Sequence, residues 1–124
     1  MKQPTPCLFC NPGNRLLENA LAYARYDDYP VSPGHVLIMT HRHVADYFDT
    51  TLAEKHALLE LIEAVKLLLD REHTPDGYNL GINCGTAAGQ SVPHVHYHLI
   101  PRYRGDMENP RGGVRGVIPA RQKY

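Results

Sequence analysis

The sequence predicts an α+β fold, in which a mainly antiparallel sheet carries one long helix on one face. Residues 51–72 contain no glycine or proline and repeat their apolar side chains at helical spacing. Short apolar segments bounded by turn residues lie before and after this stretch. Strands that precede and follow a helix in this way are typical of α+β domains. A chain of 124 residues is long enough for one core, so we expect a single domain over residues 1–124.

The helix has a clear predicted start. Thr51 and Glu54 have the spacing of a capping box, in which each side chain bonds the backbone N–H of the other residue. The apolar residues that follow recur at i, i+3, i+4 and i+7, so they share one face of the helix. They are Leu58, Leu61, Ile62, Val65, Leu68 and Leu69.

Five segments have the composition of strands, and the first two form a predicted hairpin. They are Arg15–Asn19, Ala22–Asp27, His35–Thr40, Tyr78–Cys84 and the segment that starts at His94. Gly81 lies inside the fourth segment, which indicates a close approach of another group to the backbone. Residues 102–124 follow as a basic C-terminal tail, which we expect to be wholly or partly ordered and not a second domain.

Composition and charge exclude several classes of protein. The formal net charge is zero, which does not favour a general nucleic-acid-binding surface. No apolar run is long enough to span a membrane, and the first residues lack a signal-peptide core. Three cysteines, an odd number, do not indicate a disulfide framework, so we expect a cytoplasmic protein with reduced thiols. Residues 102–124 hold six cationic and two acidic side chains, which either attract phosphate or form a solvated end.

His94, His96 and His98 alternate with apolar residues. Side chains on a strand repeat with period two, so the three imidazoles are predicted to share one face, with neighbouring Cα atoms about 6.5–7 Å apart. Imidazole has a reference pKa of about 6.5 and is largely neutral at pH 7. This row can therefore supply a nucleophile, a proton donor or a metal ligand.

The residues before the histidines favour phosphate chemistry over a catalytic metal. No Asp or Glu, which often completes a metal site, lies close in sequence. Gly89, Gln90 and Ser91 instead offer backbone N–H groups, an amide and a hydroxyl, which suit phosphate oxygens. Three classes stay open on the residues alone: nucleotidyl transfer to a histidine, a metal hydrolase or oxygenase, and a binding module without chemistry.

Cys7 and Cys10 form an isolated Cys-x-x-Cys pair. The pair is half of a zinc site, a redox pair or a chance spacing. A redox motif of the thioredoxin kind should follow a strand and open a helix, whereas a turn that contains Pro and Gly follows here. A tetrahedral zinc site needs two further ligands, and histidines are available.

The run His94–Ile100 resembles the motif of the histidine triad (HIT) family, His-φ-His-φ-His-φ-φ, where φ is an apolar residue. Every position of the motif is filled, and the resemblance extends from about Cys7 to about Arg104. It implies the HIT-like fold, which has a five-stranded antiparallel sheet and one major helix. It also implies a homodimer whose sheets join across the interface.

The resemblance implies a role for each candidate site residue. His96 matches the histidine that attacks the α-phosphorus of a nucleotide and forms a nucleotidyl-histidine intermediate. A backbone carbonyl that accepts from its Nδ1 would leave Nε2 free to attack. His98 matches the residue that bonds the phosphoryl or leaving-group oxygens, and Gln90 and Ser91 (beside Gly89) match residues that contact the phosphate and leaving group. Asn83 matches a residue that faces phosphate or sugar, and Asp27 matches the acidic residue that binds the ribose hydroxyls. His35 matches a histidine that supports the triad. For Asp27 a simple turn role is the alternative.

Zinc-containing HIT relatives complete the expected metal site. These relatives imply that His43 and His94 bind the metal together with Cys7 and Cys10. His43 lies just past a strand end, and His41 is the alternative to it. Four protein ligands make such a zinc structural. It would tie an N-terminal segment, residues 1–14, to the strand that carries the triad.

The resemblance also narrows the substrate. Residues 89–94 and 30–35 look like the fragile-histidine-triad branch, which implies a hydrolase of dinucleoside polyphosphates or related nucleotide conjugates. We then expect the protein to bind a small-molecule nucleotide and to bind neither nucleic acid nor a membrane. The alternatives are a purine nucleoside phosphoramidase of the same family and a zinc-containing protein that binds nucleotides without turnover.

Overall fold

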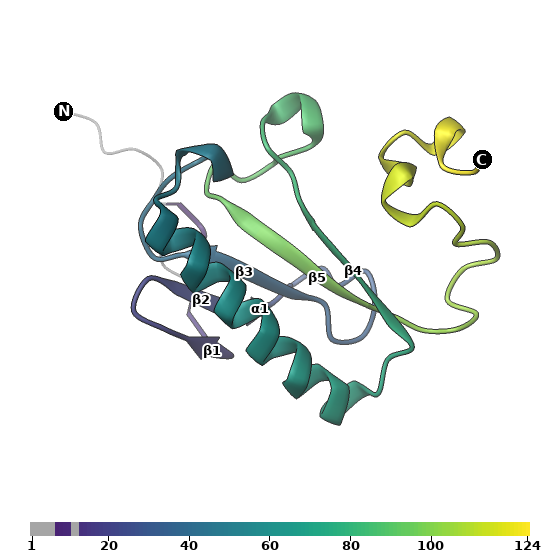
Figure 1. The fold of residues 1–124 in the computed structure, drawn as a ribbon, viewed down its shortest axis with the longest axis horizontal. Helices are drawn as coiled ribbons and strands as arrows, with labels where there is room; N and C mark the ends of the chain where they lie inside the picture. The colour runs from purple at the N-terminus through teal and green to yellow at the C-terminus, as the bar shows by residue number, and fades with distance from the viewer. Residues whose placement is uncertain (1–6, 11–12) are drawn as a thin grey trace.

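The computed structural model describes residues 7–10 and 13–124, so part of the predicted N-terminal segment 1–14 lies outside the described residues. Five antiparallel strands form one sheet in the order β1-β2-β3-β5-β4. The strands are β1 Leu17–Glu18, β2 Ala22–Tyr26, β3 Val36–Thr40, β4 Gly77–Ile82 and β5 His96–Arg102. One helix, α1 (Leu52–His73), crosses one face of the sheet (Figure 1). The predicted fold class is confirmed.

The capping box at the start of α1 forms as the sequence predicts. The Thr51 hydroxyl accepts from the Glu54 N–H, and the Glu54 carboxylate accepts from the Thr51 N–H. The apolar face of the helix packs on small and branched side chains of β2, β3 and β5. Leu58 and Leu69 are fully buried there, and burying one such side chain contributes about 1.5–3 kcal/mol. No helix in the described part of the chain is long and apolar enough to cross a membrane.

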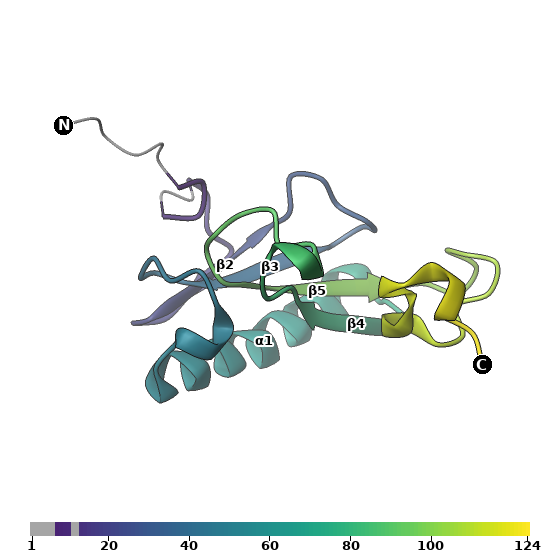
Figure 2. The same ribbon diagram turned by 90° about the horizontal axis from the view of Figure 1, so that it is seen from above.

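The sheet has one covered face and one open face. Along β5, Tyr97 and Leu99 pack into the core beneath α1. Since strand side chains alternate, His96 and His98 point to the opposite face. Figure 2 shows α1 on one side of the sheet, and the loops that follow β2 and β4 on the other. The fold therefore places the histidines on the face that the helix leaves free.

The triad strand is shorter than predicted, because β5 begins at His96 and not at His94. The His94 N–H bonds the Val92 carbonyl in a tight turn, and the Val95 N–H bonds the Val44 carbonyl. Pro93 has no N–H to give to a strand ladder. The three imidazoles therefore do not form one row: His94 turns aside before the strand starts.

The other boundaries differ by small amounts. β1 covers only two residues, and β4 ends before Asn83 and Cys84. The tail after β5 is ordered and forms two short 3-10 helices, Gly113–Val117 (η3) and Pro119–Arg121 (η4). Two further 3-10 turns, Tyr47–Asp49 and Thr86–Ala88, lie in the loops before α1 and before β5. η3 packs beside β4, so the tail forms part of the open face.

Candidate functional site

His96 is held in one tautomer by the backbone. Its Nδ1 lies 2.8 Å from the carbonyl oxygen of His94, and a carbonyl can only accept, so Nδ1 carries the proton. The lone pair is then on Nε2. Burial lowers the pKa of His96, although the bond to His94 and the nearby Asp27 oppose this shift. The imidazole is therefore neutral at pH 7, with a free ring nitrogen.

His35 and His98 form a second oriented set, which we call the histidine pair. The Val31 N–H donates to His35 Nδ1 at 3.1 Å, so the proton of neutral His35 is on Nε2. That Nε2 lies 3.0 Å from His98 Nδ1, which must accept. His98 consequently carries its own proton on Nε2. Burial, followed by the neighbouring His96 and His35, lowers the pKa of His98 to about 4.

Asp27 adjoins the histidine pair. One carboxylate oxygen accepts from the Tyr29 N–H at 2.9 Å, and the other lies 3.5 Å from His35 Nε2. The ligand atoms of Asp27, His35 and His98 lie within 4.8 Å of one another, as a metal site would require. However, the Val31 N–H already occupies His35 Nδ1, and the proton on Nε2 blocks metal coordination there. We therefore interpret this group as a hydrogen-bonded set.

His96 and His98 line one cavity of about 270 Å³, with Asp27 and Leu37 on its wall and Ser91 at its edge. Phe9 closes the cavity on one side, and its ring meets the ring of His96 edge-on with centroids 4.8 Å apart. Phe9 was not a predicted site residue. Its position between the two cysteines and its apolar character were the available signals.

The predicted phosphate-facing loop is only partly directed at this cavity. The Gln90 amide braces the loop: its oxygen accepts from the Gly85 N–H, and its nitrogen donates to the Ala45 and Val92 carbonyls. Gly89 has φ +95°, so it supplies a left-handed turn. Asn83 lines a neighbouring cavity that also contains His98. A direct substrate contact by these three residues stays a prediction.

Two cysteines and two histidines meet just before the start of β5. This cysteine cluster consists of Cys7, Cys10, His43 and His94, with all ligand atoms within 4.8 Å of one another. A turn bond from the Cys10 N–H to the Cys7 carbonyl holds the cysteine pair together. His41, the alternative ligand, lies apart from the cluster, because its ring stacks on Tyr23.

The separations in the cysteine cluster fit a tetrahedral zinc ion. Zinc bonds of about 2.3 Å to sulfur and 2.0–2.1 Å to nitrogen imply S···N separations of about 3.5–3.6 Å. The Sγ···Nδ1 distances to His94 are 3.5 Å for both cysteines, and Cys10 Sγ lies 3.2 Å from His43 Nδ1.

The tautomer of His94 also fits a metal. His94 is fully buried, and its Nε2 lies 2.7 Å from the Thr40 carbonyl, so the proton is on Nε2. Nδ1 is then a lone pair directed at the two sulfurs. A ligating histidine whose other nitrogen donates to a backbone carbonyl is the usual arrangement in metal sites. Thr40 was not predicted, because a backbone carbonyl leaves no signal in a sequence.

A profile of the HIT domain matches residues 9–105, so this chain belongs to the HIT domain family. AP-4-A phosphorylase of Mycobacterium tuberculosis is 33% identical over 102 residues, which cover 82% of this chain and 52% of the relative. An asymmetrical bis(5'-nucleosyl)-tetraphosphatase of Schizosaccharomyces pombe is 39% identical over 77 residues, or 62% of this chain and 42% of the relative. The chain thus spans about half the length of these curated relatives.

A solved structure of a zinc-bound protein is similar to this chain in fold. A Zn-bound histidine triad family protein from Mycobacterium smegmatis aligns with a TM-score of 0.75 and 29% identity, over 83% of this chain and 79% of that one. The similarity supports the HIT-like fold and is compatible with a metal in the cysteine cluster.

Proposed function

We propose that this protein cleaves dinucleoside polyphosphates or related nucleotide conjugates at the α-phosphate, through a nucleotidyl-histidine intermediate on His96. The observation that carries the proposal is the bond from His96 Nδ1 to the His94 carbonyl. It leaves the Nε2 lone pair free in a cavity that also contains His98 and Asp27. A neutral imidazole is an effective nucleophile at pH 7.

The reaction has two balanced steps. In the first, His96 Nε2 bonds to the α-phosphorus while the bond from phosphorus to the bridging oxygen breaks, and its electron pair leaves with that oxygen. The Nε2–H of His98 stabilises the charge that develops there. In the second, water bonds to phosphorus, the P–N electron pair returns to Nε2, and one water proton goes to solvent. Asp27 is assigned to the ribose hydroxyls of the nucleotide that is transferred.

The names of the relatives support this substrate class. One relative is an AP-4-A phosphorylase and the other a bis(5'-nucleosyl)-tetraphosphatase, so the acceptor in the second step is phosphate or water. Water as acceptor gives a nucleoside monophosphate and phosphate gives a nucleoside diphosphate, so product analysis distinguishes the two.

A rapid-quench experiment tests the intermediate. Diadenosine tetraphosphate labelled at the α-phosphate should give a labelled protein adduct that is acid-labile and base-stable. His96→Ala should give no adduct and lower kcat at least 10³-fold, about 4 kcal/mol, at an unchanged melting temperature. A variant that keeps a tenth of wild-type kcat would contradict the role of His96. Turnover of adenosine phosphoramidate alone would favour the phosphoramidase, and binding without any turnover would favour the non-catalytic alternative.

We further propose that the cysteine cluster holds one structural zinc ion. Its four ligands would come from the N-terminal segment (Cys7, Cys10), from the loop after β3 (His43) and from the turn before β5 (His94). The bound ion would fix these three segments relative to one another. Metal analysis of the purified protein should find about one zinc per chain.

The proposed assembly is a homodimer of single HIT domains over residues 1–124. In the described chain, β4 pairs with β5 on one side only and is an edge of the sheet. Leu80 on this edge is 43% exposed, which supports a partner at this position. Light scattering of the purified protein should give twice the mass of 14.0 kDa.

A further inference from the structure

A second cavity, of about 490 Å³, adjoins the one that His96 lines. The two share Asp27, Tyr29 and His98 as lining residues, so they lie side by side on the open face. The second cavity lies over β4 and β5, between the loop after β2 and the tail segment 113–117. Figure 2 shows this tail beside the far ends of β4 and β5. We call this cavity the distal groove.

Gly81 forms the floor of the distal groove next to the catalytic face. It is the next-to-last residue of β4 and pairs in register with His98. A Cβ built on Gly81 would meet no atom within 4 Å, and its φ is not in the left-handed region. Neither packing nor backbone conformation in this chain therefore requires glycine, although glycine inside a strand costs about 0.5–1 kcal/mol relative to alanine. What the missing side chain provides is empty space beside His98.

The chemistry of the distal groove suits a nucleoside. Its walls are largely apolar, with Val31 on one side and Val114 and Val117 on the other. Asn83 adds an amide that can pair with polar ring edges. The volume lies within the roughly 300–1,000 Å³ of small-molecule sites.

We infer that the distal groove binds the second nucleoside of a dinucleoside polyphosphate, the part that leaves with the bridging oxygen. This inference rests on the function proposed above. His96 lines only the first cavity, whereas His98 lines both. A substrate attacked by His96 therefore has its transferred nucleoside in the first cavity, and its leaving portion passes His98 into the distal groove. Gly81 is the specificity-determining residue, because it leaves room for a large leaving group.

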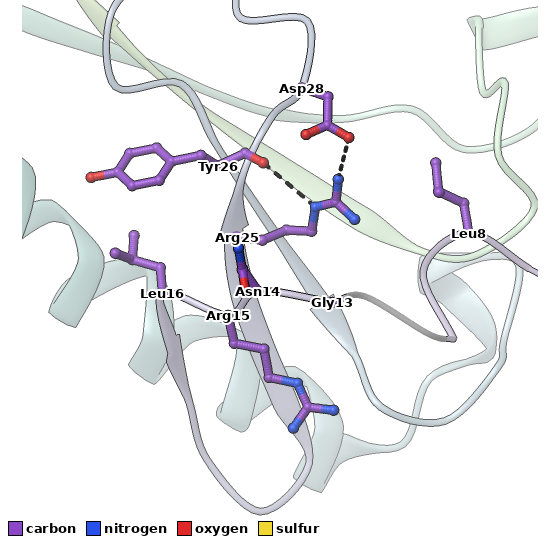
Figure 3. Close-up of a pocket in the computed structure, with 8 residues that line it drawn as sticks. All are labelled: Leu8, Gly13, Asn14, Arg15, Leu16, Arg25, Tyr26 and Asp28. Atoms are coloured by element: carbon purple, nitrogen blue, oxygen red, sulfur yellow. Dashed lines mark hydrogen bonds and ion pairs between the residues drawn. The ribbon is translucent and has the colours of Figure 1, made fainter.

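Another cavity adjoins the active site in the opposite direction and fits this ligand less well. It has a volume of about 580 Å³ and meets the first cavity at Leu8, Arg25 and Asp28. Figure 3 shows the Arg25 guanidinium directed at the Asp28 carboxylate, and Arg15 is likewise 2.7 Å from Glu18. Both cations already face carboxylates, and His98 does not line this cavity, so a leaving group that departs beside His98 would not enter it.

Filling the floor of the distal groove tests the inference. Gly81→Val adds a side chain beside His98 and should not disturb packing, because no atom lies within 4 Å of the Cβ position. Gly77→Val is the matched control, because Gly77 lies on the same face of β4, also has open space at Cβ, and lines a different cavity. The substrates are diadenosine tetraphosphate and adenosine phosphoramidate, whose leaving group is too small to occupy the groove. Gly81→Val should lower the ratio of their kcat/KM values at least tenfold, and Gly77→Val should leave the ratio unchanged.

Binding measurements separate this inference from the proposed function. A methylene-bridged, non-hydrolysable diadenosine tetraphosphate should bind the wild type more tightly than AMP, and Gly81→Val should remove that advantage. If the wild type shows this pattern but turns over neither substrate, the proposed function fails and the groove assignment stands. An unchanged ratio in Gly81→Val would overturn the assignment. So would a parallel loss for both substrates that accompanies a change in oligomeric state, because Gly81 would then serve the edge of the sheet.

Discussion

The two ends of the triad segment hold groups of similar composition that are suited to different chemistry. The cysteine cluster and the group of Asp27 with the histidine pair each bring their possible ligand atoms within 4.8 Å of one another. Distance and residue type would make both candidate metal sites. What separates them is the position of the imidazole protons, which the backbone sets.

A carbonyl next to one histidine and an amide next to another have opposite effects. The Thr40 carbonyl draws a proton to His94 Nε2 and leaves Nδ1 open toward the sulfurs. The Val31 N–H occupies His35 Nδ1, so His35 must present a proton to His98. The first arrangement suits a metal and the second orients a proton donor. A cluster of ligand types is therefore better judged by its backbone partners than by its composition.

Removal of the cysteines should have the largest effect on stability. Cys7→Ala/Cys10→Ala eliminates the sulfur ligands, and loss of an ion held about 1,000-fold above its Kd removes about 4 kcal/mol. For a domain of this size the melting temperature should fall by about 10–15 °C, while kcat changes by less than about threefold. Differential scanning calorimetry with zinc analysis measures this. Cys84→Ala, which removes the cysteine outside the cluster, is the control.

Two results would contradict the assignment of a structural metal to the cysteine cluster. One is metal-free wild-type protein with the same melting temperature as the zinc-loaded form. The other is a Cys7–Cys10 disulfide in the native protein. Either result would leave the cysteine cluster without a structural metal.

Loss of the His35 proton should affect turnover and spare the metal. His35→Phe keeps a buried ring but removes the donor to His98 Nδ1, so His98 is free to adopt the wrong tautomer. We expect kcat to fall about 100-fold, about 2.7 kcal/mol, with little change in KM and an unchanged zinc content. His41→Phe is the matched control, since His41 stacks on Tyr23 away from the pair. Zinc loss in His35→Phe that His41→Phe does not show would mean that the two groups are not independent.

Asp27 should contribute to the affinity for the nucleotide. Its carboxylate is 15% exposed and lines the cavity that contains His96 and His98. Asp27→Ala should weaken nucleotide binding by about 1–3 kcal/mol, the range for a lost hydrogen bond to a charged group. Calorimetric titration of wild type with ribo- and 2′,3′-dideoxynucleotides provides the comparison. Equal wild-type affinity for both forms would remove the ribose role and leave Asp27 as a turn residue beside Tyr29.

Much of the fold is readable from the sequence because it depends on local patterns. The capping box at Thr51 and Glu54, together with the helical spacing that follows, predicts α1 to within one residue at each end. The predicted start of β5 was wrong, because the alternation of His94, His96 and His98 in the sequence is the same whether or not His94 is in the strand. A backbone turn at Val92, which no side-chain pattern reveals, decides the boundary.

In the candidate site, too, side-chain types could be predicted from the sequence and backbone partners could not. Residue types and the family resemblance were enough to nominate the cysteine cluster, and the structure brings all four side chains together. The partners that decide chemistry are backbone groups of Thr40 and Val31, and no sequence motif encodes them. Gln90 shows the converse: its side chain matches a phosphate contact by resemblance, yet its amide bonds three backbone groups.

The smallest expected effect concerns the segment that carries His43. Arg42 precedes that ligand, and its guanidinium makes bonds of 2.9 and 2.7 Å to the buried Glu54 carboxylate. This bond to Arg42 is the main cause that lowers the pKa of Glu54 from 4.5 to about 2. Glu54→Gln should cost about 1–2 kcal/mol at pH 7, because Arg42 is half exposed and water screens part of the interaction. Since His43 belongs only to the cysteine cluster, zinc should exchange faster while kcat is unchanged; Glu60→Gln, on the exposed side of α1, is the control.

The pH dependence of the stability of the same variant gives a second test, and the direction of the expected change is fixed. A carboxylate whose pKa is lower in the folded than in the unfolded state stabilises the fold above its unfolded pKa and loses that effect as the pH falls. The difference in unfolding free energy between wild type and Glu54→Gln should therefore be constant above about pH 5 and shrink between pH 4.5 and 2. Denaturant titrations at several pH values would detect it. A difference that stays constant to pH 2 would mean that Glu54 acts through packing, and the ion pair would then have no part in holding His43 in the cysteine cluster.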